Sequence, residues 1–240
     1  MNNTANDLNQ VKVAVLYSGG LDSSVLLYHI RETLSLEWSE ILAIIVYYGQ
    51  KHSKECKVAS DFCAHFGIPC HIINLATIFK YDKDCTLLQD NADIPHEAYK
   101  EGEIPSTYVP FRNGLFLSVA ASVAIQTGAR LLFYGAHMND AAAAYPDCSE
   151  EFVTMVANAV WIGSGRQLEL HAPFINMTKA DIVKKGLRLE VPFHRTWSCY
   201  EGKEEPCGIC ATCIDRAKAF AANGFVEDGG RLIAIGHFHK

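Results

Sequence analysis

The sequence predicts an α/β protein built on a doubly wound parallel sheet with helices on both faces. Short apolar runs typical of buried strands alternate with longer stretches of helical character along the 240 residues. The loops that carry glycines and polar residues follow these strands, where ligands bind in such sheets. The length fits one compact unit. We predict a main part over residues 1–190 and a small helical, zinc-binding segment over residues 191–240.

The first half of the chain begins with VKVAVLY at residues 11–17, a buried strand that ends at a Gly-Gly pair. A helix is expected over residues 23–34. Residues 41–48 (ILAIIVYY) are rich in β-branched and aromatic side chains and predict the second strand. A helix over residues 53–66 should end at Gly67, with Pro69 beyond it, and residues 70–75 form the third strand.

The second half starts after residues 76–110, which show no clear period; so long a loop usually serves a site. Residues 113–127 predict a helix of small apolar residues closed by Gly128. Strands at residues 130–134 and 168–172 flank a helix at residues 150–161. Another helix is expected at residues 179–189, and the pattern is helical again after Cys213.

Composition limits the class of protein. The chain is 49% hydrophobic and 20% charged, which is typical of a globular protein. No apolar run approaches the ~20 residues of a membrane span, and residues 1–10 lack the layout of a secretory signal. The net charge of −6 disfavours nucleic acid as the main partner. We therefore expect a cytoplasmic protein, and the oligomeric state is left open, a homodimer included.

Nine cysteines are unevenly distributed, and four of them fall within fifteen residues. Five dispersed cysteines are typical of small core residues. The clustered set predicts tetrahedral zinc bound by four thiolates, with Gly208 easing the turn between them. An iron–sulfur cluster is the rival interpretation and a redox or disulfide pair is a third. The predicted ligands are Cys199, Cys207, Cys210 and Cys213.

The string SGGLDSS lies between the first strand and its helix and predicts a phosphate-binding loop. Two glycines allow close approach of the backbone to an anion, and serine hydroxyls and helix N–H groups supply donors. It matches neither the Walker pattern nor GxGxxG. An ordinary strand-to-helix turn capped by serines is the alternative. The predicted cofactor-binding residues are Ser18, Gly19, Gly20, Leu21, Asp22, Ser23 and Ser24.

This loop resembles that of the N-type (PP-loop) ATP pyrophosphatases, which cleave ATP to AMP and pyrophosphate. Further strings narrow the resemblance to the 7-cyano-7-deazaguanine (preQ0) synthase family, QueC, of queuosine biosynthesis. They run over most of the chain: VYYGQKH (residues 46–52), PSTYVPFRNGLFL (105–117), YGAH (134–137), AYPDCSEEF (144–152), TKADIV (178–183), and WSCYEG with the cysteine quartet and IDRAKAF. Two departures are Phe111, where the commonest family form has glycine, and the variant stretch at residues 137–144.

The resemblance implies an adenine-nucleotide α-hydrolase type of fold and a C–N ligase activity. The expected substrates are 7-carboxy-7-deazaguanine, free ammonia and ATP with Mg²⁺. Adenylation turns the carboxylate oxygen into a leaving group, ammonia gives the amide, and a second adenylation gives the nitrile. AMP and pyrophosphate are therefore the expected products.

The resemblance also assigns residue roles. Asp22 is expected to act in catalysis and to touch Mg²⁺, while Arg112 and Lys179 neutralise developing phosphate charge; a surface salt bridge is the alternative for each basic residue. The deazaguanine is expected to contact Tyr145 and Asp147, although Asp147 could instead cap the helix before Glu150. An adenine pocket is expected near Gln50 and His52.

Three other functions remain open. A tRNA-thiolating relative would need a catalytic cysteine pair and a basic surface, and the acidic balance disfavours it. A paralogue that adenylates the same carboxylate for a different acceptor is compatible with the variant stretch. A nucleotide-sensing or zinc-ribbon module without catalysis is disfavoured by the intact SGGLDSS string.

Overall fold

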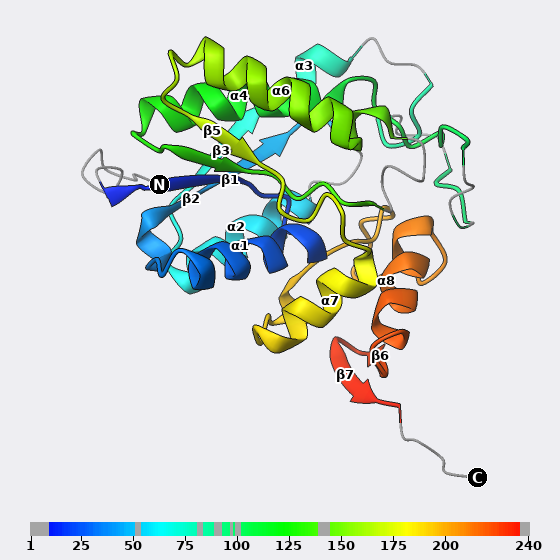
Figure 1. Ribbon diagram of the computed structural model, residues 1–240. Coiled ribbons are helices and arrows are strands. Elements are labelled where there is room, and N and C mark those ends of the chain that lie inside the picture. The colour runs from blue at the N-terminus through cyan, green and yellow to red at the C-terminus, as the bar shows by residue number, and fades with distance from the viewer. Residues whose placement is uncertain are drawn as a thin grey trace.

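The computed structural model describes residues 10–50, 54–80, 84–88, 93–96, 98, 102–138 and 145–235. Its centre is a five-stranded sheet in the order β3-β2-β1-β4-β5 in which every neighbouring pair is parallel (Figure 1). The strands are β1 (Val13–Leu16), β2 (Ile41–Tyr47), β3 (Cys70–Asn74), β4 (Leu131–Phe133) and β5 (Glu169–His171). The strand order reverses at β1, so the fold has the switch point at which open α/β sheets bind ligands.

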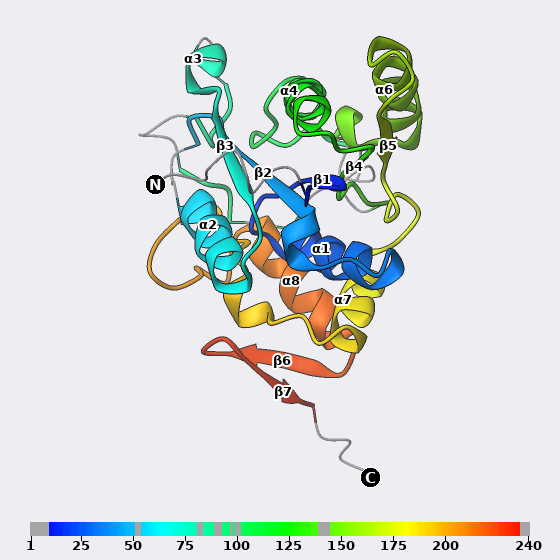
Figure 2. The ribbon, with the colours of Figure 1, turned by 90° about the vertical axis from the view of Figure 1, so that its left-hand side faces the viewer.

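Helices cover both faces of this sheet, which confirms the predicted doubly wound fold class (Figures 1 and 2). One face carries α4 (Arg112–Gln126) and α6 (Glu150–Gly163). The other carries α1 (Leu21–Thr33) and α2 (Lys54–Phe66), and α7 (Lys179–Arg188) and α8 (Ala211–Ala221) extend that layer away from the sheet. Single 3-10 turns occupy Trp38–Glu40, Pro146–Cys148 and Phe193–Arg195.

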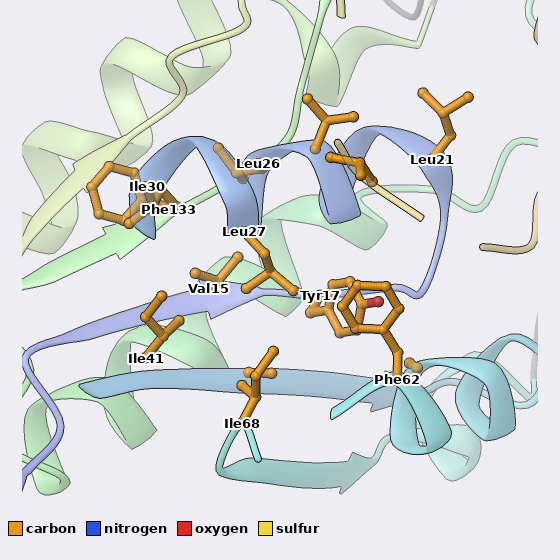
Figure 3. Packing of buried hydrophobic residues seen from close by; sticks show 14 of the residues in the cluster. Val15, Tyr17, Leu21, Leu26, Leu27, Ile30, Ile41, Phe62, Ile68 and Phe133 are labelled. Carbon is orange, nitrogen blue, oxygen red and sulfur yellow. The ribbon is translucent and has the colours of Figure 1, made fainter. Parts of the chain in front are cut away.

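The strands read as continuous apolar runs because both of their faces are buried. Val13 and Val15 of β1 face the α1 side, whereas Ala14 between them faces the α4 side. Figure 3 shows Val15 lying against Leu27 of α1, with Tyr17 and Phe62 packed farther along the same layer. Full burial of such side chains contributes roughly 1.5–3 kcal/mol each, so the sheet and its helices are mutually dependent.

The predicted strands and helices are present, with ends shifted by a few residues. Two elements were not predicted. A short helix α3 (Ala76–Phe79) follows β3, and an antiparallel hairpin pairs β6 (Phe225–Asp228) with β7 (Arg231–Ala234). The hairpin turn is Gly229-Gly230, both with positive φ, and a Gly-Gly pair between two apolar alternating stretches is a known hairpin signal.

The C-terminal segment from residue 191, called the cysteine-rich segment below, packs onto the main part of the protein. Phe193 and Phe220 meet edge to face at 5.0 Å inside the larger core cluster. The buried guanidinium of Arg216 donates to both carboxylate oxygens of Glu227 on β6, at 2.7 and 2.8 Å, and to Thr196 Oγ1 at 2.8 Å. The predicted boundary at residue 190 stays a prediction, since this core is shared across it.

Phe111 precedes α4 with φ +55°, in the left-handed region. A side chain there costs about 1–2 kcal/mol, whereas glycine adopts this conformation freely. The ring of Phe111 lies edge to face with Phe152 at 6.0 Å. A Cβ on Gly114 would lie 2.4 Å from that ring, so Gly114 makes the room for it.

Every helix among the described residues is too short or too polar to cross a lipid bilayer.

Candidate functional site

The carboxyl ends of β1, β2 and β4 open into a cavity of about 250 Å³. Residues just beyond each strand line it, among them Ser18 after β1, Tyr48 after β2 and Gly135 after β4. Arg112, Lys179 and Trp197 enter from α4, α7 and the cysteine-rich segment. The cavity therefore lies at the switch point of the sheet, where the sequence placed the phosphate loop.

The phosphate loop is held open by its own side chains. The Gly20 N–H donates to Ser18 Oγ at 3.2 Å, and the Ser18 and Ser23 hydroxyls are 3.0 Å apart. Gly20 is the N-cap of α1 and, having no side chain, it leaves the free N–H groups of that helix end uncapped. Uncapped N–H groups and the helix dipole together form an anion site. The geometry therefore suits a phosphate or pyrophosphate group.

The predicted loop residues divide into two sets. Ser18, Gly20, Leu21, Asp22 and Ser23 line the cavity. Gly19 and Ser24 do not line it: Ser24 is fully buried with its hydroxyl 3.1 Å from that of Tyr17, and Gly19 packs on α2. Their contact with phosphate stays a prediction, and in the structure they fix the shape of the loop.

Asp22 is the charged centre of the loop. Its Oδ2 lies 3.5 Å from Lys179 Nζ and 3.6 Å from Nε2 of the buried His137. Burial alone would raise the pKa of Asp22, but Lys179 and then His137 outweigh it and hold the pKa well below its usual range. Asp22 is therefore ionised at neutral pH. Because its pKa is lowered on folding, this pairing stabilises the fold above the unfolded pKa of about 3.9 and is lost as pH falls below it.

Arg112 lies half-buried in the wall of the cavity. Its Nη1 donates to the Tyr48 hydroxyl at 3.3 Å, and its guanidinium lies 5.4 Å from the centre of the Tyr48 ring and 6.0 Å from that of Phe116. No carboxylate among the described residues lies within 4.0 Å of it. Among the described residues, Arg112 therefore does not form the surface salt bridge that was the alternative interpretation. Lys179 does form an ion pair, but with Asp22 inside the cavity.

The two predicted substrate residues are placed differently. Tyr145 lines the cavity, and its hydroxyl lies 2.8 Å from Thr107 Oγ1. Asp147 lies behind the wall, 3% exposed, and its Oδ2 accepts the Asn113 N–H at 2.8 Å near the start of α4. The helix that begins at Glu150 is capped by Ser149 instead, so the alternative of Asp147 as cap of that helix is wrong. Its role in binding substrate stays a prediction.

Gln50 lines the cavity, as the expected adenine pocket requires, but its side chain is engaged. Its Oε1 accepts the Tyr48 N–H at 2.9 Å, and its Nε2 donates to Cys56 Sγ at 3.5 Å. The other residue expected in this pocket, His52, lies outside the described residues. So do residues 139–144 of the variant stretch.

Several residues of the site were missed by reasoning from the sequence. Glu55 on the first turn of α2 and Asn113 at the start of α4 line the cavity, and the buried His137 after β4 lies against Asp22. The strings that contain Asn113 and His137 were recognised without a role for either residue. Glu55 lies only five residues after Gln50, which itself follows the second strand. This short distance from the end of a strand was the signal that could have identified Glu55 as a site residue.

The four clustered cysteines have a geometry that can hold a metal ion. Their sulfur atoms all lie within 4.8 Å of one another, and Cys207 Sγ is 4.0 Å from Cys213 Sγ. Zinc–sulfur bonds of about 2.3 Å in a tetrahedron put sulfur atoms roughly 3.8 Å apart, so the set fits this ion. Backbone N–H groups donate to Cys199 Sγ from Cys207 and to Cys207 Sγ from Cys210, each at 3.3 Å. The quartet can therefore hold a metal, and four thiolates leave no open position on a tetrahedral ion.

Trp197 links the metal site to the phosphate loop. Its backbone N–H donates to the Gly19 carbonyl at 2.9 Å, and its indole Nε1 donates to the Cys199 carbonyl at 2.7 Å. The Lys54 ammonium lies 3.7 Å from the centre of the indole ring and donates to the Lys203 and Glu204 carbonyls of the cysteine loop. The segment thus closes one wall of the cavity.

Gly19→Ala is expected to weaken ATP binding at least about tenfold. The φ of Gly19 is +77°, and a Cβ would lie 2.9 Å from the Ala59 backbone nitrogen, so the loop must shift. Gly67→Ala is the matched control: its φ is +69° but a Cβ there meets open space, so it carries only the backbone cost of about 1–2 kcal/mol. Calorimetric titration with ATP compares the two. Equal affinities would show that the tight contact with α2 does not shape the site.

Comparisons with known proteins agree with this arrangement. The sequence matches the family described as queuosine biosynthesis protein QueC over residues 12–224. It is 40% identical over 214 residues to the 7-cyano-7-deazaguanine synthase of Caldicellulosiruptor bescii, covering 89% of this chain and 94% of the relative. It is 41% identical over 217 residues to that of Methanoregula boonei, covering 90% and 97%.

A solved structure with a related fold is the U34-tRNA thiolase NcsA from Methanococcus maripaludis with its [4Fe-4S] cluster. The TM-score is 0.51 at 18% identity, and the match covers 90% of this chain and 68% of the thiolase. At that identity the likeness shows the shared fold alone.

Proposed function

The chain belongs to the QueC family of queuosine biosynthesis proteins, and on that premise we propose that it converts 7-carboxy-7-deazaguanine and ammonia into 7-cyano-7-deazaguanine with ATP. The observation that carries the proposal is the Asp22–Lys179 pair beside the uncapped N-terminus of α1, inside one cavity. Such a site binds the phosphates of ATP beside a second molecule that must receive AMP.

The chemistry follows from the poor reactivity of a carboxylate. Its oxygen attacks the α-phosphorus of ATP and pyrophosphate leaves, which gives an acyl adenylate. Ammonia then attacks the acyl carbon, AMP leaves and an amide remains. A second ATP adenylates the amide oxygen, and loss of AMP with two protons from nitrogen leaves the nitrile. Two ATP are consumed for each nitrile.

The described residues suit these steps. The N–H groups of the loop and the Lys179 ammonium would stabilise charge on the departing pyrophosphate. The Arg112 guanidinium, with no carboxylate within 4.0 Å among the described residues, would bind a phosphate or the substrate carboxylate. Asp22 would hold Mg²⁺, which would supply positive charge that stabilises the charge on the phosphate groups. We assign zinc to the cysteine quartet, with a structural role.

We expect turnover to release AMP and pyrophosphate rather than ADP and phosphate. The protein is incubated with ATP, Mg²⁺, ammonium and 7-carboxy-7-deazaguanine, and nucleotides and nitrile are identified by mass. Phosphate is assayed with and without added pyrophosphatase, and should appear only with it. ADP as the main nucleotide would contradict the proposed function. Formation of an adenylate that reacts with another amine but not with ammonia would indicate the paralogue with a different acceptor.

A further inference from the structure

We propose that the Glu55 carboxylate binds the guanine-like edge of the substrate, accepting hydrogen bonds from its N1–H and 2-amino groups. This inference rests on the proposed function and deepens it, because it names the residue that selects the heterocycle.

Glu55 lies on the first turn of α2, where it lines the main cavity and a smaller adjoining one. The residues shared by the linings of the two cavities are all aromatic or polar: Tyr48, Gln50, Glu55, Trp197 and Tyr200. Aromatic rings on the walls suit a flat heterocycle, and a carboxylate in such a place suits its polar edge.

The carboxylate of Glu55 makes no hydrogen bond or ion pair with the described part of the chain. No basic side chain of the described residues lies within 4.0 Å of it: Lys54 donates to the Lys203 and Glu204 carbonyls, and Arg112 donates one hydrogen bond to the Tyr48 hydroxyl. Burial raises the pKa of Glu55 to about 7, and the positive charge of Arg112 opposes the rise. Two donors from a ligand would favour the ionised form and replace the water lost on burial.

The other carboxylates and the Gln50 carbonyl near the cavity each have an oxygen engaged by a neighbouring residue. Asp147 accepts the Asn113 N–H, and Gln50 Oε1 accepts the Tyr48 N–H. Asp22 is held between Lys179 and His137 at the phosphate loop. Of the described carboxylates that line the cavity, Glu55 is therefore the one that keeps both oxygens for a ligand.

The donor pattern of the ligand decides which ring this carboxylate fits. A deazaguanine presents N1–H and the 2-amino group side by side, and two carboxylate oxygens accept both. Adenine presents its amino group beside the lone pair of N1, which repels an ionised carboxylate. Glu55 therefore fits the deazaguanine rather than the base of ATP.

The test is Glu55→Gln, which replaces one acceptor with a donor that opposes N1–H. We expect KM for 7-carboxy-7-deazaguanine to rise roughly ten- to a hundredfold, the loss typical of a bidentate base contact, while KM for ATP stays within about twofold. The same change should abolish the preference of the wild type for this substrate over its analogue without the 2-amino group. Glu55→Asp, which keeps both oxygens, should retain that preference even if binding weakens. Glu151→Gln, exposed on the first turn of α6, is the control and should change neither constant.

The outcomes separate the two proposals. Calorimetry first tests whether the wild type binds 7-carboxy-7-deazaguanine, and no binding would overturn the proposed function together with this inference. If the wild type binds and turns over the compound but Glu55→Gln changes only KM for ATP, Glu55 serves the adenine side and the inference alone is wrong. The inference would also be overturned if Glu55→Asp lost the preference for the substrate with the 2-amino group while the wild type showed this preference.

Discussion

Asp22→Ala is expected to lower the rate of AMP formation by at least about a hundredfold while the protein stays folded. The carboxylate lies at the start of α1 between Lys179 and His137, where Mg²⁺ and the phosphates of ATP would be held. Its removal would take away the proposed Mg²⁺ ligand and would leave the Lys179 ammonium without its ion-pair partner. Loss of one preorganised group at a reacting centre typically costs 10²–10³ in rate.

Two variants control for the fold. Asp22→Asn keeps the shape of the side chain and should be nearly as inactive, because the charge is what matters. Asp61→Ala removes an exposed carboxylate from α2, where it pairs with Lys57 at 2.6 Å, and should leave the rate unchanged. Thermal unfolding should show a measurable loss for Asp22→Ala, because its pairing with Lys179 and His137 stabilises the fold at neutral pH, but the protein should remain folded at the assay temperature. A folded Asp22→Ala protein with the wild-type rate would remove the loop from the mechanism.

Cys210→Ser is expected to reduce bound zinc from about one per chain to a small fraction of that and to destabilise the C-terminal segment. Cys210 is completely buried at the start of α8, and zinc binding there is folding free energy for the segment. Isolated zinc-finger peptides gain on the order of 10 kcal/mol from the metal; part of this segment is also held by Phe220 and Arg216, so the loss should be smaller.

Activity should fall as a consequence of that loss. Trp197 joins the Cys199 carbonyl to the Gly19 carbonyl, so a loosened metal site leaves the phosphate loop without one of its supports. Elemental analysis and thermal unfolding measure the effect, and Cys70→Ser, a half-buried cysteine on β3 outside the quartet, is the control that should keep its metal. Iron with a visible charge-transfer band would refute the zinc assignment and reopen the thiolation alternative. A stable, fully active Cys210→Ser protein without metal would show that the quartet serves another purpose.

The sequence was most informative where local chemistry decides the structure. The strands were recognisable because both of their faces are buried, so that β2 is apolar at nearly every position. The phosphate loop followed from glycines and serines between a strand and a helix, and the metal site from close spacing of four thiols. In each case the residues that act together are near neighbours in the chain.

The tertiary structure decided which distant residues share the cavity. Asp147 and Glu55 are both carboxylates after strands, yet one is buried at the start of α4 and the other lines the cavity. The contact between His137 and Asp22 could not be predicted from the sequence, because the two residues are brought together only by the pairing of β1 with β4. Sequence determines the chemistry that each loop carries, but the packing of helices on the sheet determines which side chains keep free acceptors, since a hydrogen bond made inside the fold is no longer available to a ligand.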